Sequence, residues 1–160
     1  MSVDLPTTDI GFDHDQIDQS ASTREVPLKW VVVVDEALAA GRAVNAAVCV
    51  AGATTTRVRG LLGSDVVDAD GHAHPGLPWL GCTILHAPQE RLHEIRVTAA
   101  QRPDVALVDM PTQAQHTRVY DDYVFGVSRS RARDLDYYAV SVVGPRKVVD
   151  TLVKGLSLMP

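Results

Sequence analysis

Six polar side chains of the sequence stand near the ends of apolar segments, where an open α/β sheet binds its ligands. Asp35 follows a run of valines, and Asp109 follows the run VALV. Arg42 and Asn45 lie three residues apart and would share one face of a helix after the first run. If the two runs are parallel strands, these groups meet at one edge of the sheet. The expected cluster contains Asp35, Arg42, Asn45, Asp109, Thr112 and Gln113.

An arginine that faces carboxylates at a cleft suits two roles. It can orient a carboxylate or phosphate ligand while a free aspartate accepts a proton or positions a water. It can also form a structural ion pair that holds the helix to the sheet edge, and both interpretations stay open. In the catalytic interpretation, Asp109 positions water and Arg42 clamps an anionic group. The other catalytic candidates are Asn45 and Thr112, and the ligand-binding candidates are Asp35 and Gln113.

A second group of reactive side chains surrounds the sequence DADGHAH. His72 and His74, near Asp68 and Asp70, are of the types that ligate metals. The Asp-Gly pair beside them is a strong tight-turn signal, so a hairpin tip explains these residues better. We therefore expect no metal site.

Other patterns exclude several classes of function. Cys49 and Cys82 lie far apart without a C-x-x-C pattern, so both are expected to be reduced and structural. The sequence contains no Walker loop, no G-x-G-x-x-G after a strand, no G-x-S-x-G and no H-E-x-x-H, so no cofactor is expected. The alternating arginines of SRSRARD, together with the tyrosines, could touch RNA, but the net charge of −5 disfavours it and a solvated loop explains them better.

The elements that must position the candidate residues alternate along the chain. Four apolar stretches predict strands, and they are LKWVVVVDE, LPWLGCTILHA, DVALVDM and YYAVSVVGP. Helices are expected from about residue 41 or 42 to about 53, within APQERLHEIRVTAAQRP, over 112–127 and in PRKVVDTLVKG. This order favours right-handed crossovers onto one sheet. We expect an α/β fold with three layers, α/β/α, around a mixed, mainly parallel four-stranded sheet.

The 160 residues divide into an arm and one domain. Residues 1–26 are polar and acid-rich without clear periodicity, and we expect a groove on the same domain or a neighbouring subunit to hold this arm. Residues 27–160 are expected to form a single α/β domain. No stretch approaches the length of apolar sequence that a membrane span needs, so we expect no membrane contact and a cytoplasmic location.

The segments KWVVVVDEALAAGRAVNAAVCVAGA, VVDADGHAHPGLPW, VDMPTQAQHTRVYDDY and VVGPRKVVDTLVKGLSL carry a family resemblance. Over roughly residues 28–160 the chain resembles the domain-of-unknown-function family numbered two thousand, which in turn resembles the type II peptidyl-tRNA hydrolases. That resemblance implies a mixed four-stranded sheet with helices on both faces and pairing into homodimers. The matching positions are Gly41-Arg42, Asn45-Ala46, Asp109, Thr112-Gln113 and Gly144-Pro145.

The chain departs from the hydrolase pattern at two of these positions. Arg42 stands where the hydrolases carry lysine, and arginine holds its proton too firmly to exchange it. The spacing from Asp109 to Thr112 is one residue shorter. The best functional interpretation is a small hydrolase-derived enzyme that acts on an ester or amide with an anionic group. The alternative is a non-catalytic, homo-oligomeric module that binds a small molecule or a protein.

Overall fold

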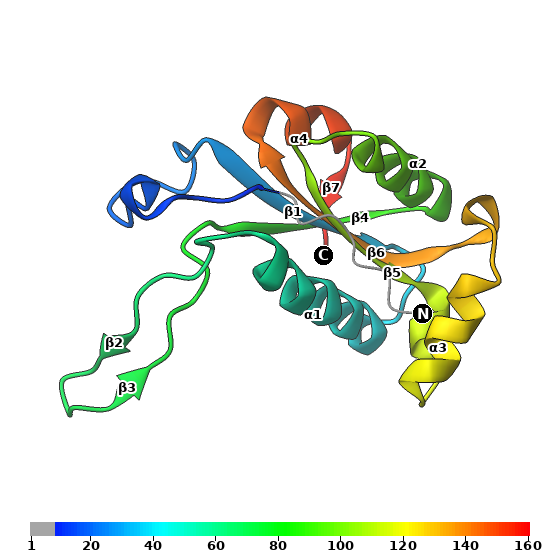
Figure 1. Cartoon of the computed structure of the whole chain (residues 1–160), viewed down its shortest axis with the longest axis horizontal. Coiled ribbons are helices and arrows are strands. Elements are labelled where there is room, and N and C mark those ends of the chain that lie inside the picture. The colour runs from blue at the N-terminus through cyan, green and yellow to red at the C-terminus, as the bar shows by residue number, and fades with distance from the viewer. Residues whose placement is uncertain (1–8) are drawn as a thin grey trace.

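A computed structural model describes residues 9–160 of the chain, and Figure 1 shows its elements. The strands are β1 (Leu28–Asp35), β2 (Val66–Val67), β3 (Ala73–His74), β4 (Cys82–Ala87), β5 (Ala106–Pro111), β6 (Tyr137–Pro145) and β7 (Ser157–Leu158). The α-helices are α1 (Ala40–Arg57), α2 (Gln89–Ala100), α3 (Tyr120–Ser128) and α4 (Arg146–Leu152). Three short 3-10 helices are η1 (His14–Gln16), η2 (Thr112–Gln115) and η3 (Ala132–Asp134).

The main sheet has five strands in the order β5-β6-β1-β4-β7. The α/β class is confirmed, but the expected four strands and mainly parallel pairing are corrected. Among the strands of this sheet in residues 9–160, only β1 and β4 pair in parallel, whereas β6 is antiparallel to both β1 and β5 and β7 is antiparallel to β4. β1, β4 and β5 run in the same direction, but β6 lies between two of them in the opposite direction. A strand that is buried on both faces, as β6 is, carries no polar face that reveals its direction.

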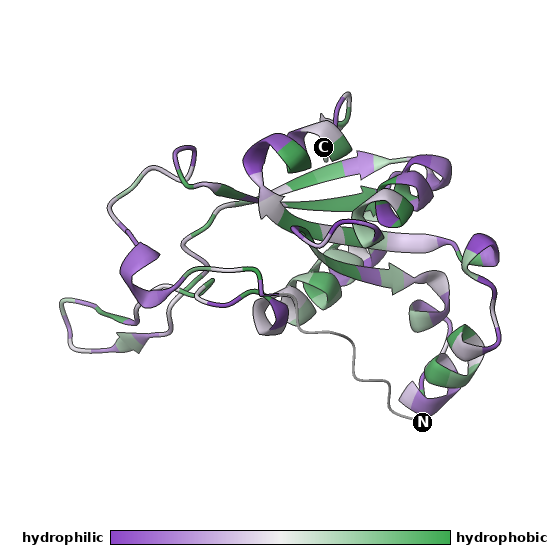
Figure 2. Cartoon of the chain, turned by 45° about the horizontal axis from the view of Figure 1, so that its top comes forward, coloured by the Kyte–Doolittle hydropathy of each residue, from purple (hydrophilic) through white to green (hydrophobic). Residues whose placement is uncertain are grey.

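Helices cover both faces of this sheet, which gives three layers (Figure 1). α1 packs on one face, and α2 and α4 pack on the other. Alternate residues of β1 enter the two cores: Trp30, Val32 and Val34 face α1, and Val31 and Val33 face α2 and α4. Figure 2 shows the apolar colouring of the strands between these layers.

Two of the helix boundaries differ from expectation. α1 continues four residues beyond the predicted end, to Arg57. The helix expected over 112–127 is instead divided into η2 and α3. In the described part of the chain, no helix is both long enough and apolar enough to span a membrane.

A chain of buried hydrogen bonds connects α1 to the centre of the sheet. The indole Nε1–H of Trp30 donates to Ser141 Oγ at 2.9 Å, and Ser141 and Thr54 share a hydrogen bond of 2.8 Å. The hydroxyl of Thr54 donates its only proton to the Val50 carbonyl at 2.7 Å, so Ser141 must be the donor to Thr54. The three side chains, each at most 3% exposed, therefore satisfy one another in sequence.

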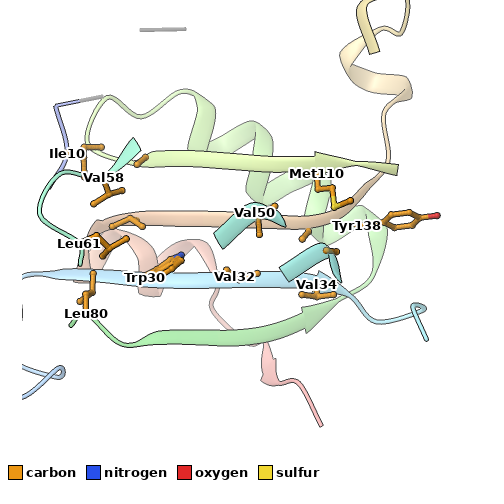
Figure 3. Close-up of a cluster of buried hydrophobic side chains, with 14 of the residues drawn as sticks. Ile10, Trp30, Val32, Val34, Val50, Val58, Leu61, Leu80, Met110 and Tyr138 are labelled. Carbon is orange, nitrogen blue, oxygen red and sulfur yellow. The ribbon is translucent and has the colours of Figure 1, made fainter. Parts of the chain in front are cut away.

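The described part of the N-terminal arm is held by its own domain. Ile10 and Phe12 are buried in the core on the α1 face, and Figure 3 shows Ile10 beside Val58. The Phe12 amide donates to the Arg59 carbonyl at 2.8 Å, and the Arg59 amide donates to the Ile10 carbonyl at 3.1 Å. A side chain on Gly11 would lie 2.3 Å from that Arg59 carbonyl oxygen, so this close approach of two backbones requires glycine. Of the two expected anchors for the arm, its own domain is the one that residues 10–12 contact. Residues 1–8 lie outside the described residues.

Candidate functional site

A groove of about 400 Å³ lies between α1, β5 and α3, and we call it the α1–α3 groove. One face of α1 forms one wall, β5 forms the floor, and two tyrosines of α3 form the other wall. The ring centroids of these tyrosines lie 5.4 Å apart. The groove is lined by Asn45, Cys49, Val50, Ala53, Val108, Asp109, Met110, Ala114, Tyr120 and Tyr123.

A network of polar side chains adjoins the groove through Asn45, and we call it the Arg42 cluster. The guanidinium of Arg42 donates through Nε to Gln115 Oε1 and through Nη2 to the Tyr138 hydroxyl, both at 2.8 Å. Gln115 in turn donates from Nε2 to the Arg42 carbonyl at 2.9 Å and to Asn45 Oδ1 at 3.0 Å. The ring Nε2 of His116 lies 2.9 Å from the same Tyr138 hydroxyl. The cluster therefore consists of Arg42, Asn45, Gln115, His116 and Tyr138.

Among the described residues 9–160, no acid balances the charge of Arg42. Its partners are an amide and a phenol, and it forms no ion pair with any carboxylate of residues 9–160. A guanidinium carries five N–H groups, and the described residues supply acceptors for two of them. The bonds to Gln115 and Tyr138 orient the guanidinium of this exposed residue, which reduces the loss of side-chain freedom when an anion binds.

A β-bulge turns Tyr138 toward this cluster. Met110 pairs with Ala139 and Pro111 pairs with Tyr137, so the register passes over Tyr138. As a result, Tyr138 and Ala139 both join the core on the α1 face, although successive strand residues normally alternate. Figure 3 shows Tyr138 at the end of that core beyond Met110.

Asp35 lies apart from the cluster on the other face of the sheet. It continues the β1 face that packs on α2 and α4, and only 6% of its surface is exposed. Its carboxylate accepts the Ala37 amide at 3.0 Å and Gln89 Nε2 at 2.8 Å. Gln89 also pairs with both backbone groups of Tyr137. Through these contacts Asp35 connects the end of β1 to the start of α2, which is a structural role.

Asp109 also faces α2, where its carboxylate accepts Arg96 Nε at 3.0 Å. Because β5 is an edge strand, Asp109 still reaches the rim of the α1–α3 groove. There it affects Tyr123: burial and then the negative charge of Asp109 raise the pKa of that phenol. The structure thus brings Asp109 and Asn45 to one groove but gives Asp109 and Arg42 separate partners.

The two remaining candidates lie in η2. Thr112 Oγ1 contacts its neighbour Gln113 at 3.5 Å, and the Thr112 amide donates to the Asp136 carbonyl. The glutamine that contacts Arg42 and Asn45 is Gln115, two residues beyond the predicted one. Sequence reasoning also missed His116 and Tyr138. A 3-10 turn at 112–115 would have suggested Gln115, whereas no local signal marks the bulge at Tyr138.

Comparison with known proteins finds one family and one solved structure. A family model described as "Protein of unknown function (DUF2000)" matches residues 28–160. No curated protein matches the chain. The structure of a protein of unknown function from Agrobacterium tumefaciens strain C58 is similar with a TM-score of 0.78 and 18% sequence identity, and the match covers 84% of this chain and 98% of that one. At this identity the likeness shows a shared fold.

Proposed function

The chain belongs to the DUF2000 family of proteins of unknown function, and on that premise we propose that it binds a small anionic molecule in the α1–α3 groove. One observation carries this proposal: Arg42 is hydrogen-bonded to neutral partners beside the groove and forms no ion pair with a carboxylate of residues 9–160. A planar guanidinium in this state favours a carboxylate or phosphate, which it can bind through two parallel hydrogen bonds.

The groove suits the rest of such a ligand. Its volume of about 400 Å³ lies within the usual range of small-molecule sites, roughly 300 to 1,000 Å³. Tyr120 and Tyr123 supply aromatic surface on one wall, and Met110 and Val108 supply an apolar floor. The side chain of Asn45 connects this surface to Gln115 and hence to Arg42. We therefore propose a ligand with a planar or apolar body and one anionic end.

Hydrolysis of an ester or amide is the second candidate function. It is favoured by the presence of Asp109 on the rim of the same groove as Asn45. It is weakened because the Asp109 carboxylate pairs with Arg96 rather than facing the Arg42 cluster. The resemblance of the motifs to those of the type II peptidyl-tRNA hydrolases is a second argument for hydrolysis. Binding without turnover is compatible both with Asp109 on the rim of the groove and with its ion pair to Arg96.

Self-association, which the family resemblance implies, also stays a proposal. Apolar side chains stand exposed on the two helices that flank the groove, among them Val48 at 63% and Phe125 at 63%. Apolar surface of this kind beside a groove is typical of interaction sites. We place a homodimer contact there, and light scattering of the purified chain would give its mass.

A thermal-shift screen with Arg42→Ala tests the binding proposal. We expect at least one small carboxylate or phosphate compound to raise the midpoint of unfolding, since a ligand at a hundred times its Kd stabilises the native state by about 2.7 kcal/mol. In Arg42→Ala the affinity should fall roughly tenfold to a hundredfold, because a hydrogen bond to a charged group contributes about 1.5 to 3 kcal/mol.

The matched control is Arg133→Ala, which removes an equal charge from an exposed residue of η3. This variant should bind the ligand as the unaltered chain does. If every hit survives Arg42→Ala, the anionic group is not bound at the Arg42 cluster. If a hit is turned over, and Asp109→Asn abolishes turnover without loss of binding, hydrolysis replaces simple binding as the function.

A further inference from the structure

The β2–β3 hairpin projects from the body of the protein (Figure 1) and carries a charge pattern that the groove does not explain. Each of its strands has two residues, paired as Val66 with His74 and Val67 with Ala73. Between residues 62 and 77 the sequence contains three aspartates and two histidines, but no lysine or arginine. Such a short two-stranded hairpin is marginally stable in water without additional contacts.

The two histidines converge on one carboxylate oxygen. His72 Nδ1 lies 3.4 Å from Asp68 Oδ2, and His74 Nε2 lies 3.3 Å from the same oxygen. The carboxylate of Asp70 is close as well, since ligand atoms of Asp68, Asp70 and His72 lie within 4.8 Å of one another. These donors come from both sides of the hairpin turn and number two imidazoles and two carboxylates.

Two of the separations among these donors match the edge of a tetrahedral metal site. Bonds from Zn²⁺ to histidine nitrogen and carboxylate oxygen are about 2.0 to 2.2 Å, which places neighbouring ligands of a tetrahedron roughly 3.3 to 3.5 Å apart. The two measured nitrogen-to-oxygen distances, 3.4 and 3.3 Å, fall in that range.

The backbone of the turn holds the central carboxylate in position. Asp68 Oδ1 accepts the amides of Asp70 and His72, both at 2.9 Å, which leaves Oδ2 directed at the histidines. The amide of His72 first, and then the contact with His74, lower the pKa of Asp68.

We propose that the tip of the hairpin binds one divalent transition-metal ion such as Zn²⁺, with Asp68, Asp70 and His72 as ligands and His74, which contacts Asp68 Oδ2, as the fourth. Imidazole and carboxylate together suit zinc and its neighbours in the first transition row, whereas calcium and magnesium prefer oxygen donors alone. The bound ion connects the two strands of the hairpin. It stabilises an element that has little apolar core of its own.

The experiment uses the whole chain, stripped of metal with a chelator and then titrated with ZnCl₂. Calorimetry should give one ion per chain, and NMR should show the imidazole signals of His72 and His74 shifting together. We expect His72→Ala and His74→Ala each to weaken Zn²⁺ binding at least about tenfold, and the double variant to abolish binding.

His14→Ala is the matched control, because His14 is an exposed histidine of η1 and does not belong to the tip of the hairpin. This variant should bind Zn²⁺ like the unaltered chain. Circular dichroism checks that each variant is folded. If the double variant keeps the same affinity, or if the two imidazole signals do not respond to Zn²⁺, the proposal is overturned and the histidines are only hydrogen-bond partners of Asp68.

Discussion

Phe12→Ala is expected to lower the free energy of unfolding by about 3 to 5 kcal/mol, the range for a phenylalanine removed from a core. Only 3% of the Phe12 surface is exposed, and its ring lies 4.6 Å from the ring of Trp79 between their centroids. The substitution leaves a cavity between the arm and the core and exposes part of Trp79. Urea unfolding of the two chains, followed by tryptophan fluorescence, measures the difference.

The control for Phe12 is Asp13→Ala, one residue further along the arm. Asp13 forms an ion pair with Arg59 at 2.8 Å, but both side chains are more than half exposed. Exposed pairs contribute at most about 1 kcal/mol, so this variant should lose little stability. If Phe12→Ala loses no more than Asp13→Ala, the arm is not part of the cooperative core. In that case the arm would open locally, and a protease would cleave it without unfolding of the sheet.

Ser141→Ala should lower the free energy of unfolding by about 1 to 3 kcal/mol. The cost arises because the indole N–H of Trp30 loses its acceptor inside the protein, and Thr54 loses the proton that Ser141 donates to it. The volume removed is a single oxygen atom, so packing changes little. Chemical denaturation with an unchanged m-value would show that the loss is one of stability rather than of compactness.

A double-mutant cycle with Trp30→Phe separates the lost hydrogen bond from general damage. Once phenylalanine has removed the indole donor, Ser141→Ala leaves no unpaired N–H at position 30 and should cost less than it does in the unaltered chain. The coupling between the two positions should be about 0.5 to 3 kcal/mol. Purely additive losses would contradict the donor chain from Trp30 to Thr54.

The candidate site was partly predictable from the sequence. Arg42 and Asn45 were expected on one helical face, and both belong to the Arg42 cluster. Their glutamine partner was placed two residues too early because the segment after β5 forms a 3-10 turn before α3 begins. The expected meeting of Arg42 with Asp35 and Asp109 does not occur, since both aspartates face α2.

The position of Asp109 shows why such an expectation fails. In β5, apolar residues occupy both faces, with Val108 and Met110 toward α1 and Leu107 toward α2. A strand whose two faces are both apolar contains no alternation that assigns a side to its one aspartate. Tyr138 adds a second difficulty, because the bulge that turns it toward Arg42 exists only through pairing with β5.

The sequence by itself determined the α/β class, the four long strands and the helix that carries Arg42 and Asn45, because runs of valine and helical spacing are local properties. Only the tertiary structure decided that β6 runs antiparallel between β1 and β5, that Asp35 and Asp109 face away from Arg42, and that Tyr138 and Gln115 complete the cluster. These features depend on hydrogen bonds between segments far apart in the chain. A strand buried on both faces can form those bonds in either direction until its neighbours are in place.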